Sequence, residues 1–198
     1  MTQTTSKPSQ HPARAQEIIA VAQSLIQSRG YNGFSFRDIA DTVGIKSASI
    51  HYHFPTKSDL AVAAAADYRA KFLEILADIA TQNLTGVREL QAYAGVFEIT
   101  LERSGNVCLC GVLASEFESL TDDVRGEVDR FFKDQSVWVA RAIRKGQADG
   151  EIQSTIDAEA FAPAYVSGLE GAMIIARSTQ SVDHLRSAAN QYLNLIKV

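Results

Sequence analysis

The chain of 198 residues is poor in cysteine and has no long apolar run. Its two cysteines, Cys108 and Cys110, are too close along a helix start for a relaxed disulfide, and they are too few for a structural zinc site. No apolar run is long enough to cross a membrane, so we expect no membrane association. The polar N-terminus lacks the apolar segment of a secretory signal, which favours a cytoplasmic protein.

Strand patterns and internal repeats are also missing. No segment alternates apolar and polar residues over strand length, and no fixed period recurs. Apolar residues instead recur at helical spacing, between Gly, Pro and capping residues that mark helix ends. The spacing predicts nine helices, over residues 12–29, 36–43, 47–53, 57–82, 86–103, 108–120, 122–148, 158–177 and 182–196.

Charge is unevenly divided along the chain. The formal net charge is −4, yet residues 1–60 hold six Lys and Arg against four Asp and Glu. The net negative charge argues against a protein that coats nucleic acid along its whole surface. A locally positive edge at the N-terminal end is still sufficient for a protein that contacts DNA at one face.

Residues 34–60 predict a helix, a tight turn, a second short helix and a capped third. Ser35 and Asp38 form the pattern of a capping box, and so do Thr56 and Asp59 at the start of the third helix, while Gly44 ends the first helix. The next helix has about seven residues before Phe54-Pro55 breaks it. A helix that short needs tertiary support, which Ile45, Ile50 and Phe54 can provide. Its polar side chains then face a partner; they are Ser47, Ser49, His51, Tyr52 and His53.

This stretch resembles the DNA-binding domain of the tetracycline-repressor (TetR) family. The matching motifs are S-F-R-D-I-A at 35–40, V-G-I at 43–45, S-I-H-Y-H-F at 49–54 and K-S-D-L at 57–60. The resemblance covers about the first third of the chain and implies an all-α protein. An N-terminal three-helix helix-turn-helix domain is followed by a helical ligand-binding and dimerisation domain. The implied division is a disordered arm over 1–12, a DNA-binding domain over 13–55 and an effector-binding and dimerisation domain over 56–198.

The resemblance also implies roles for individual residues on double-stranded operator DNA. Base edges in the major groove would be read by Arg37, Ser47 and Ser49, and Arg37 suits a bidentate contact to guanine. The DNA backbone would be contacted by Ser35, His51, Tyr52, His53 and Lys57, with Lys7 and Arg14 near the arm. Two positions depart from the family pattern: Lys46 replaces a small capping hydroxyl but could reach a phosphate, and His51 replaces Tyr but can still donate to phosphate.

For the remainder, the resemblance implies a homodimer through the two C-terminal helices and a repressor released from a palindromic operator by a small-molecule effector. The sequence does not indicate the chemical class of the effector, and the resemblance implies no cofactor or metal. Candidate pocket residues are Tyr93, Phe97, Leu101, Cys108, Phe117, Phe131, Trp138, Tyr165, Glu170 and Met173. Glu116, Glu170 and Arg141 are expected on the surface; any of them turned inward would need a partner.

Three alternatives stay open. A thiol at a helix start can have a lowered pKa, so Cys108 or Cys110 could sense thiol-reactive compounds, as in some family members; the other interpretation is that both are small buried apolar residues. A helical adaptor would bind protein through the same face without DNA specificity. A Cys-dependent enzyme would need Cys108 paired with a histidine, which must be one of His11, His51, His53 or His184.

Overall fold

The computed structural model describes residues 11–198, so the arm expected over 1–12, Lys7 included, lies almost wholly outside the described residues. The described part contains nine α-helices, one 3₁₀ turn, η1, over Phe117–Ser119, and a single isolated bridge between Ile152 and Lys197. The helices are α1 Ala13–Arg29, α2 Phe36–Val43, α3 Ser47–His53, α4 Lys57–Thr81, α5 Gly86–Ser104, α6 Leu109–Ser115, α7 Asp122–Ala148, α8 Ala158–Thr179 and α9 Val182–Ile196.

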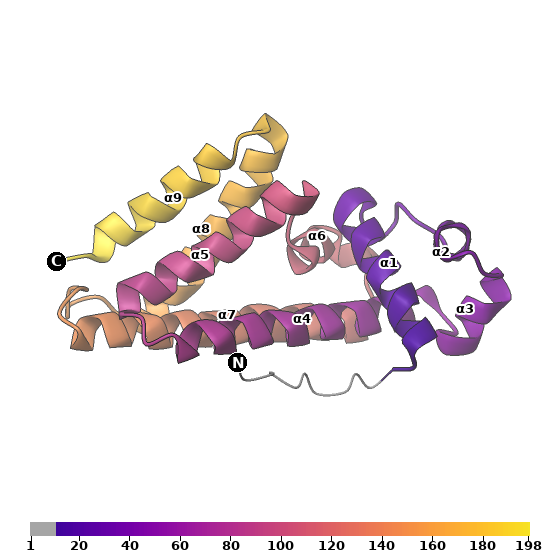
Figure 1. Cartoon of the computed structure of the whole chain (residues 1–198), viewed down its shortest axis with the longest axis horizontal. Coiled ribbons are helices and arrows are strands. Elements are labelled where there is room, and N and C mark those ends of the chain that lie inside the picture. Colours follow the sequence, from indigo (N-terminus) through magenta and orange to yellow (C-terminus); the bar gives the residue numbers. More distant parts are fainter. Residues whose placement is uncertain (1–10) are drawn as a thin grey trace.

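The helices form a small three-helix unit joined to a larger helical body (Figure 1). Helices α1 to α3 gather at one end, and the long helix α4 leads from them into the body. There α4 packs along α7, while α5, α8 and α9 complete the bundle. The short helix α6 lies where the body meets α1 and contacts α1, α4 and α7. The all-α prediction and its element order are confirmed.

The small unit has its own apolar core. Ile18 and Ile26 of α1, Ile39 of α2 and Ile50 of α3 are completely buried, and Leu60 closes the core from the first turn of α4. Burying each such side chain contributes roughly 1.5–3 kcal/mol. The seven-residue helix α3 is therefore held by tertiary packing, since its length alone would not stabilise it.

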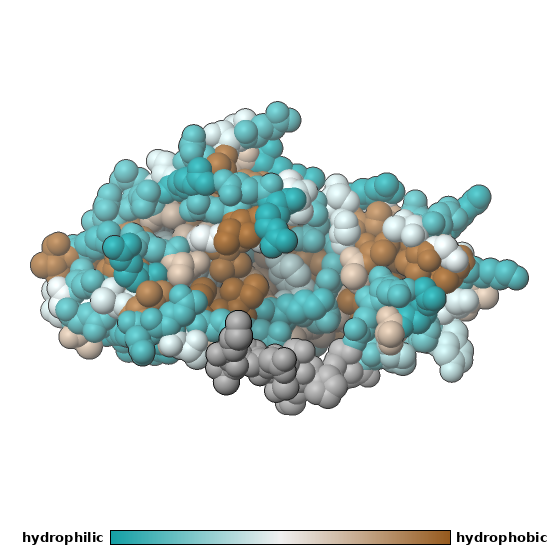
Figure 2. Space-filling model, in the orientation of Figure 1, coloured by the Kyte–Doolittle hydropathy of each residue, from teal (hydrophilic) through white to brown (hydrophobic). Residues whose placement is uncertain are grey.

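The body core is rich in aromatic rings. Phe72 of α4 lies edge-on to Tyr93 of α5 and to Phe131 of α7, with ring centroids 6.1 and 5.3 Å apart. Tyr165 of α8 tilts against Tyr93 at 6.0 Å. These contacts join the helices that surround the centre of the body. The view in Figure 2 shows a mostly hydrophilic face with separate hydrophobic patches over the body and the three-helix unit.

A cluster of ion pairs around one buried carboxylate joins the start of α5 to the end of α7. Glu89 is fully buried and bonds to Arg141 at 2.6 Å and to Lys145 at 2.8 Å. The two helices approach so closely there that a Cβ on Gly86 would lie 2.1 Å from the backbone nitrogen of Gly146. Arg141 thus has a partner within the chain.

Most predicted helix boundaries agree with the structure within about two residues, and the sixth helix is the exception. It was expected over 108–120, but α6 ends at Ser115 and the chain passes through η1. The helix stops because Glu116 leaves helical geometry, at φ −105° and ψ 27°, and directs its carboxylate to the turn after α1. In the part of the chain that the structure describes, no helix is long and apolar enough to span a membrane.

Candidate functional site

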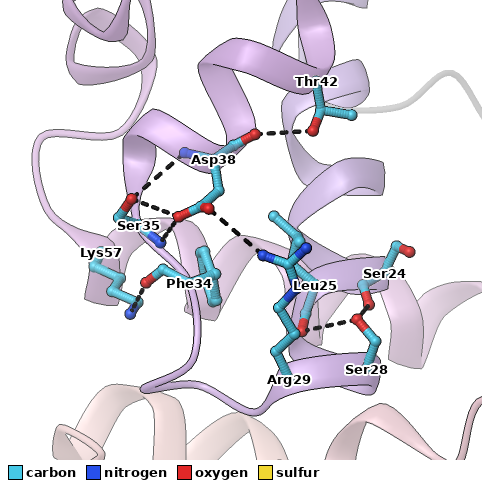
Figure 3. Close-up of polar contacts among 9 residues, drawn as sticks. All are labelled: Ser24, Leu25, Ser28, Arg29, Phe34, Ser35, Asp38, Thr42 and Lys57. Carbon is cyan, nitrogen blue, oxygen red and sulfur yellow. Dashed lines mark hydrogen bonds and ion pairs between the residues drawn. The ribbon is translucent and has the colours of Figure 1, made fainter.

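The start of α2 is fixed by a complete capping box (Figure 3). The Ser35 amide donates to Asp38 Oδ2 at 2.7 Å, and the Asp38 amide donates to Ser35 Oγ at 3.4 Å. Hydrogen bonds from Ser35 hold the pKa of Asp38 below its usual value. Arg29 of α1 lies 3.5 Å from the same carboxylate. These bonds thus fix where α2 begins and how it is oriented relative to the preceding loop.

A left-handed glycine makes the turn between α2 and α3. Gly44 has φ +73° and donates its amide to the Ala40 carbonyl, to which Ile45 also donates at 3.0 Å. A side chain at position 44 would be strained there, since φ > 0 favours glycine. The helix then begins at Ser47 after Lys46, whose side chain makes no capping bond. The departure at Lys46 therefore leaves α3 uncapped without moving its start.

One face of α3 is buried and the opposite face is open. Ile50 is fully buried, whereas Tyr52 is 84% exposed. Lys46, Ser49, Tyr52 and His53 line one shallow hollow with Arg14 of α1, Ile45 and Ala48. The structure therefore brings together several residues that the sequence predicted to face DNA. Hydroxyl, imidazole and cationic groups at one surface can all bond to phosphate or base edges.

The remaining predicted DNA contacts differ in how available they are. Arg37 and Lys46 are exposed and form no ion pair within residues 11–198. His51 packs edge-on to Phe36 at 4.7 Å, and its Nδ1 lies 3.2 Å from the Pro55 carbonyl, which holds the ring in place. Ser47 is half-buried.

Lys57 is turned toward the protein. Its Nζ donates to the Phe34 carbonyl at 2.5 Å and lies 4.2 Å from the centroid of the Phe34 ring (Figure 3). Partial burial lowers the pKa of Lys57. Another capping box, between Thr56 and Asp59, starts the helix that carries it. A phosphate contact by Lys57 would require this ammonium to turn outward.

The body contains a small, partly open cavity of about 10 Å³ at the junction of α4, α5, α6 and α8. A space of that size holds about one water molecule. Its lining residues are Tyr68, Phe72, Val96, Phe97, Thr100, Cys108 and Met173. Three of these, Phe97, Cys108 and Met173, were predicted as pocket residues. Tyr68 and Phe72 were missed as pocket residues because their helical spacing on α4 indicated only a core face.

Four other predicted pocket residues pack in the body core without lining this cavity, and Trp138 is only partly buried. Tyr93 and Tyr165 use their hydroxyls internally, donating to Gln135 Oε1 at 2.5 Å and to the Leu90 carbonyl at 3.1 Å. Phe131 is buried beside Phe72. Trp138 stacks on Tyr93 and donates from its indole nitrogen to the Leu76 carbonyl at 3.2 Å.

Two predicted pocket residues lie elsewhere. Phe117 is 52% exposed, because η1 turns it to the surface, where the Arg125 guanidinium lies 4.1 Å from its ring. Leu101 lines a separate outer hollow at the end of α5, with Arg177 of α8 and Gln180. Neither lines the central cavity.

Glu170, one of the candidate pocket residues, is half-buried and has one carboxylate oxygen turned inward, whereas its charge was expected on the surface. Its Oε1 is inaccessible to solvent and has no hydrogen-bond partner within the described residues. The carboxylate is close enough to the Cys108 thiol for its charge to raise the pKa of that thiol. Burial raises the pKa of Glu170 to about 7. Glu170 was predicted from the sequence as the one acidic residue among the candidate pocket residues, but no sequence signal indicated that one of its oxygens would lack a partner.

The two cysteines are free thiols in buried positions. Burial, followed by the charge of Glu170, raises the pKa of Cys108 and of Cys110 well above the usual thiol value. In this conformation burial outweighs the helix end and raises both pKa values, which favours the interpretation of the two cysteines as small buried apolar residues over that of a thiol sensor. The groups within reach of Cys108 are Tyr68 and Glu170, whereas His184 is exposed on α9.

Helix α6 connects the cavity to the three-helix unit. At its start, the Val107 carbonyl accepts a bond from Gln27 of α1 at 2.8 Å, next to Cys108 in the cavity wall. At its end, the Glu116 carboxylate accepts bonds from the backbone amides of Tyr31 and Asn32 at 2.9 and 3.0 Å. A shift of α6 must therefore move or break its contacts to α1 and the turn after it.

Comparison with known proteins gives the family. The model described as "Bacterial regulatory proteins, tetR family" matches residues 18–64, and the model described as "Tetracyclin repressor-like, C-terminal domain" matches residues 86–192. The chain belongs to the TetR family. This TetR-family protein is a DNA-binding transcriptional regulator, and its three-helix unit is the helix-turn-helix domain.

The similarity to known proteins covers nearly the whole chain. A TetR-family regulator from Agrobacterium tumefaciens is 33% identical, with 94% of this chain and 98% of that chain covered and a TM-score of 0.90. The transcriptional regulator AcuR of Cereibacter sphaeroides is 26% identical over 87% of this chain and 80% of its own length. The repressor DhaR of a Mycobacterium species is 22% identical over 91% and 89%. These relatives are regulators, which gives no support to the enzyme alternative.

Proposed function

We propose that this TetR-family protein is a cytoplasmic homodimeric repressor, which binds a palindromic operator and is released by a small-molecule effector. The observation that carries the DNA-binding part is the open face of α3, where Lys46, Ser49 and Tyr52 surround one outward hollow. The proposed DNA-binding domain covers residues 13–55, and the effector and dimerisation domain covers 56–198.

The proposed DNA contacts divide into two groups. Arg37, Ser47 and Ser49 read base edges, since they lie on or beside the exposed side of the helix-turn-helix. Tyr52, His53, His51 and Ser35 contact the backbone, and these positioning contacts carry no sequence information directly. Lys57 supports the fold through Phe34 and joins the backbone contacts only if its ammonium turns outward.

The proposed dimer forms through α8 and α9. Ile174 and Ile175 of α8 are 52% and 47% exposed, and Leu195 of α9 is 66% exposed. Large apolar side chains exposed on two adjacent helices favour burial against another surface. The two helices pack closely against each other, because the Tyr192 ring of α9 lies against Gly168 of α8 at a distance that a Cβ would block. A two-fold dimer presents two recognition helices to a palindrome.

The proposed release mechanism runs through α6. An effector in the central cavity contacts Cys108 at the start of this helix, and Glu116 at its other end holds the turn after α1. An effector that binds better to a shifted α6 position then favours a dimer whose recognition helices no longer match the operator. Because both thiols are buried, a non-covalent effector accounts for release better than a thiol-reactive compound.

Binding to the DNA upstream of the protein's own gene tests this function. Fluorescence anisotropy at several salt concentrations should show tighter binding to that DNA than to a shuffled sequence of the same length. The affinity should fall steeply as salt rises, because phosphate contacts release counterions. Absence of specific, salt-sensitive binding to the upstream DNA would point to the protein-binding adaptor instead.

A further inference from the structure

The Glu170 carboxylate is packed against α6 with one oxygen unused. An added Cβ at Gly111 of α6 would lie 2.7 Å from Glu170 Oε2, so the glycine makes room for this oxygen. The other oxygen, Oε1, is buried without a hydrogen-bond partner among the described residues. A buried polar atom without a partner costs free energy, and an ionised carboxylate costs the most.

No cation of the described chain compensates this carboxylate. Within residues 11–198, no Lys, Arg or His forms an ion pair with Glu170, although thirteen other ion pairs are present. The titratable groups that respond to its charge are Tyr68 of α4, Tyr93 of α5, and Cys108 and Cys110 of α6. Each of these groups is neutral or anionic, so none of them can balance a negative charge.

The carboxylate lies behind the wall of the central cavity and is not among its lining residues. Cys108, which lines the cavity, has its pKa raised by the charge of Glu170, and Met173, which also lines it, is one helical turn from Glu170 on α8. The remaining wall is largely aromatic, with Phe72 and Phe97 meeting at a centroid distance of 6.3 Å. Aromatic ring faces attract cations, most strongly where water is excluded. The site therefore combines an unpartnered carboxylate with aromatic walls.

We propose that the effector carries a cationic head, an ammonium or amidinium group, which binds Glu170, and a small apolar body that lies against Phe72, Phe97 and Met173. This inference rests on the proposed function and specifies the class of its effector. The cavity holds only about one water in this conformation, so the ligand must displace side chains. Met173 is the most adaptable of them, and movement of Cys108 would be passed to α6.

Matched small molecules test the assignment. Binding of n-butyl, cyclohexyl and benzyl ammonium ions to the full chain is measured by calorimetry and compared with the corresponding alcohols and carboxylates. At least one ammonium ion should bind roughly tenfold or more tightly than its alcohol, the effect of a charge-assisted hydrogen bond. In Glu170→Gln this preference should disappear, and in Glu118→Gln, an exposed glutamate of η1, it should remain.

Proton release gives a second readout. Because the pKa of Glu170 is about 7, a cation bound at pH 7 should displace about half a proton, seen as a difference in heat between phosphate and Tris buffers. The proposal is overturned if no ammonium ion binds better than its alcohol, or if Glu170→Gln keeps the preference. Operator binding without ligand is measured in parallel: its absence defeats the proposed function, whereas its presence with no ammonium preference defeats only the effector class.

Discussion

Glu116 Oε1 accepts a hydrogen bond from the backbone amide of Tyr31 at 2.9 Å, which attaches the end of α6 to the turn after α1. The turn is shaped to receive it. Gly30 has φ +81°, and a Cβ at that position would lie 1.9 Å from the same Glu116 oxygen. Both residues therefore define one contact between the body and the DNA-binding unit.

Removing this carboxylate should loosen the turn. We expect Glu116→Ala to lower the free energy of unfolding by roughly 1–3 kcal/mol, because it removes several charge-assisted bonds at a half-buried site. Amide exchange at Tyr31 and Asn32 should become faster. The change should be absent in Glu118→Ala. Unaltered protection of both amides in Glu116→Ala would show that the contact does not hold the turn.

Glu170 should make stability depend on pH. Its pKa is about 7 in the folded protein against an ordinary value of 4.5, so the folded state binds the proton more strongly. Stability is therefore lost as the pH rises from 4.5 through 7, by about 3 kcal/mol in total. Glu170→Gln does not titrate, and its stability relative to wild type should rise by about that amount between pH 5 and pH 8.

Urea unfolding at the two pH values measures this difference. Any cost of placing an amide at position 170 applies equally at both, so only the pH-dependent part is compared. Glu118→Gln provides the matched control at an exposed carboxylate. An equal offset between wild type and Glu170→Gln at both pH values would mean that the carboxyl titrates normally.

The two thiols should be unreactive in the folded protein. Cys108 and Cys110 are buried, and burial raises the pKa of each, so little thiolate is present at pH 8. We expect maleimide to leave both unmodified over a time in which glutathione reacts completely, and to label both in urea. Mass spectrometry distinguishes these states. Rapid labelling of Cys108 in the native protein, with loss of operator binding, would instead support a thiol-reactive signal.

The dimer proposal predicts a position-specific effect of charge. Ile175→Glu places a carboxylate in the proposed α8–α9 interface and should weaken dimerisation at least about thirtyfold, the equivalent of roughly 2 kcal/mol. Val137→Glu is the control, since Val137 is 67% exposed on α7. Analytical ultracentrifugation measures both. If Ile175→Glu remains as dimeric as Val137→Glu, these helices do not form the interface.

The features that sequence predicted are the local ones. The capping boxes of Ser35 and Thr56 and the turn at Gly44 depend on residues within a few positions of each other, and the structure contains all three. The need of a seven-residue helix for tertiary support also placed Ile50 in the core, where it is completely buried. The polar face of α3 followed from these elements, since a helix with one buried side presents the other outward.

The features that sequence did not predict depend on distant partners. Glu116 bonds to a turn 85 residues earlier in the chain, which shortens α6 and exposes Phe117. Glu170 packs against α6 because Gly111 of that helix makes room for its carboxylate. Period and composition carry no information on such pairs, so Glu170 was predicted as one of ten candidate pocket residues without any sign that one of its oxygens would be buried and unpartnered.

Variants of Arg37 and Tyr52 should distinguish a residue that reads bases from a residue that contacts the DNA backbone. Arg37→Ala should lose affinity for the operator by roughly 1–3 kcal/mol and relax the preference at one base pair of each half-site. Tyr52→Ala, at the 84% exposed position on α3, should weaken binding to every sequence about equally. Binding to a set of single-base operator variants measures both. An unchanged preference in Arg37→Ala would rule out its role in reading bases.

Selection of binding sites from random double-stranded DNA tests the central claim most directly. The purified full chain should enrich a two-fold symmetric sequence whose half-sites are separated by about one helical turn or a multiple of it, as a dimer of helix-turn-helix units requires. Enrichment of no sequence, or of one without two-fold symmetry, would contradict the account of a homodimeric operator-binding repressor.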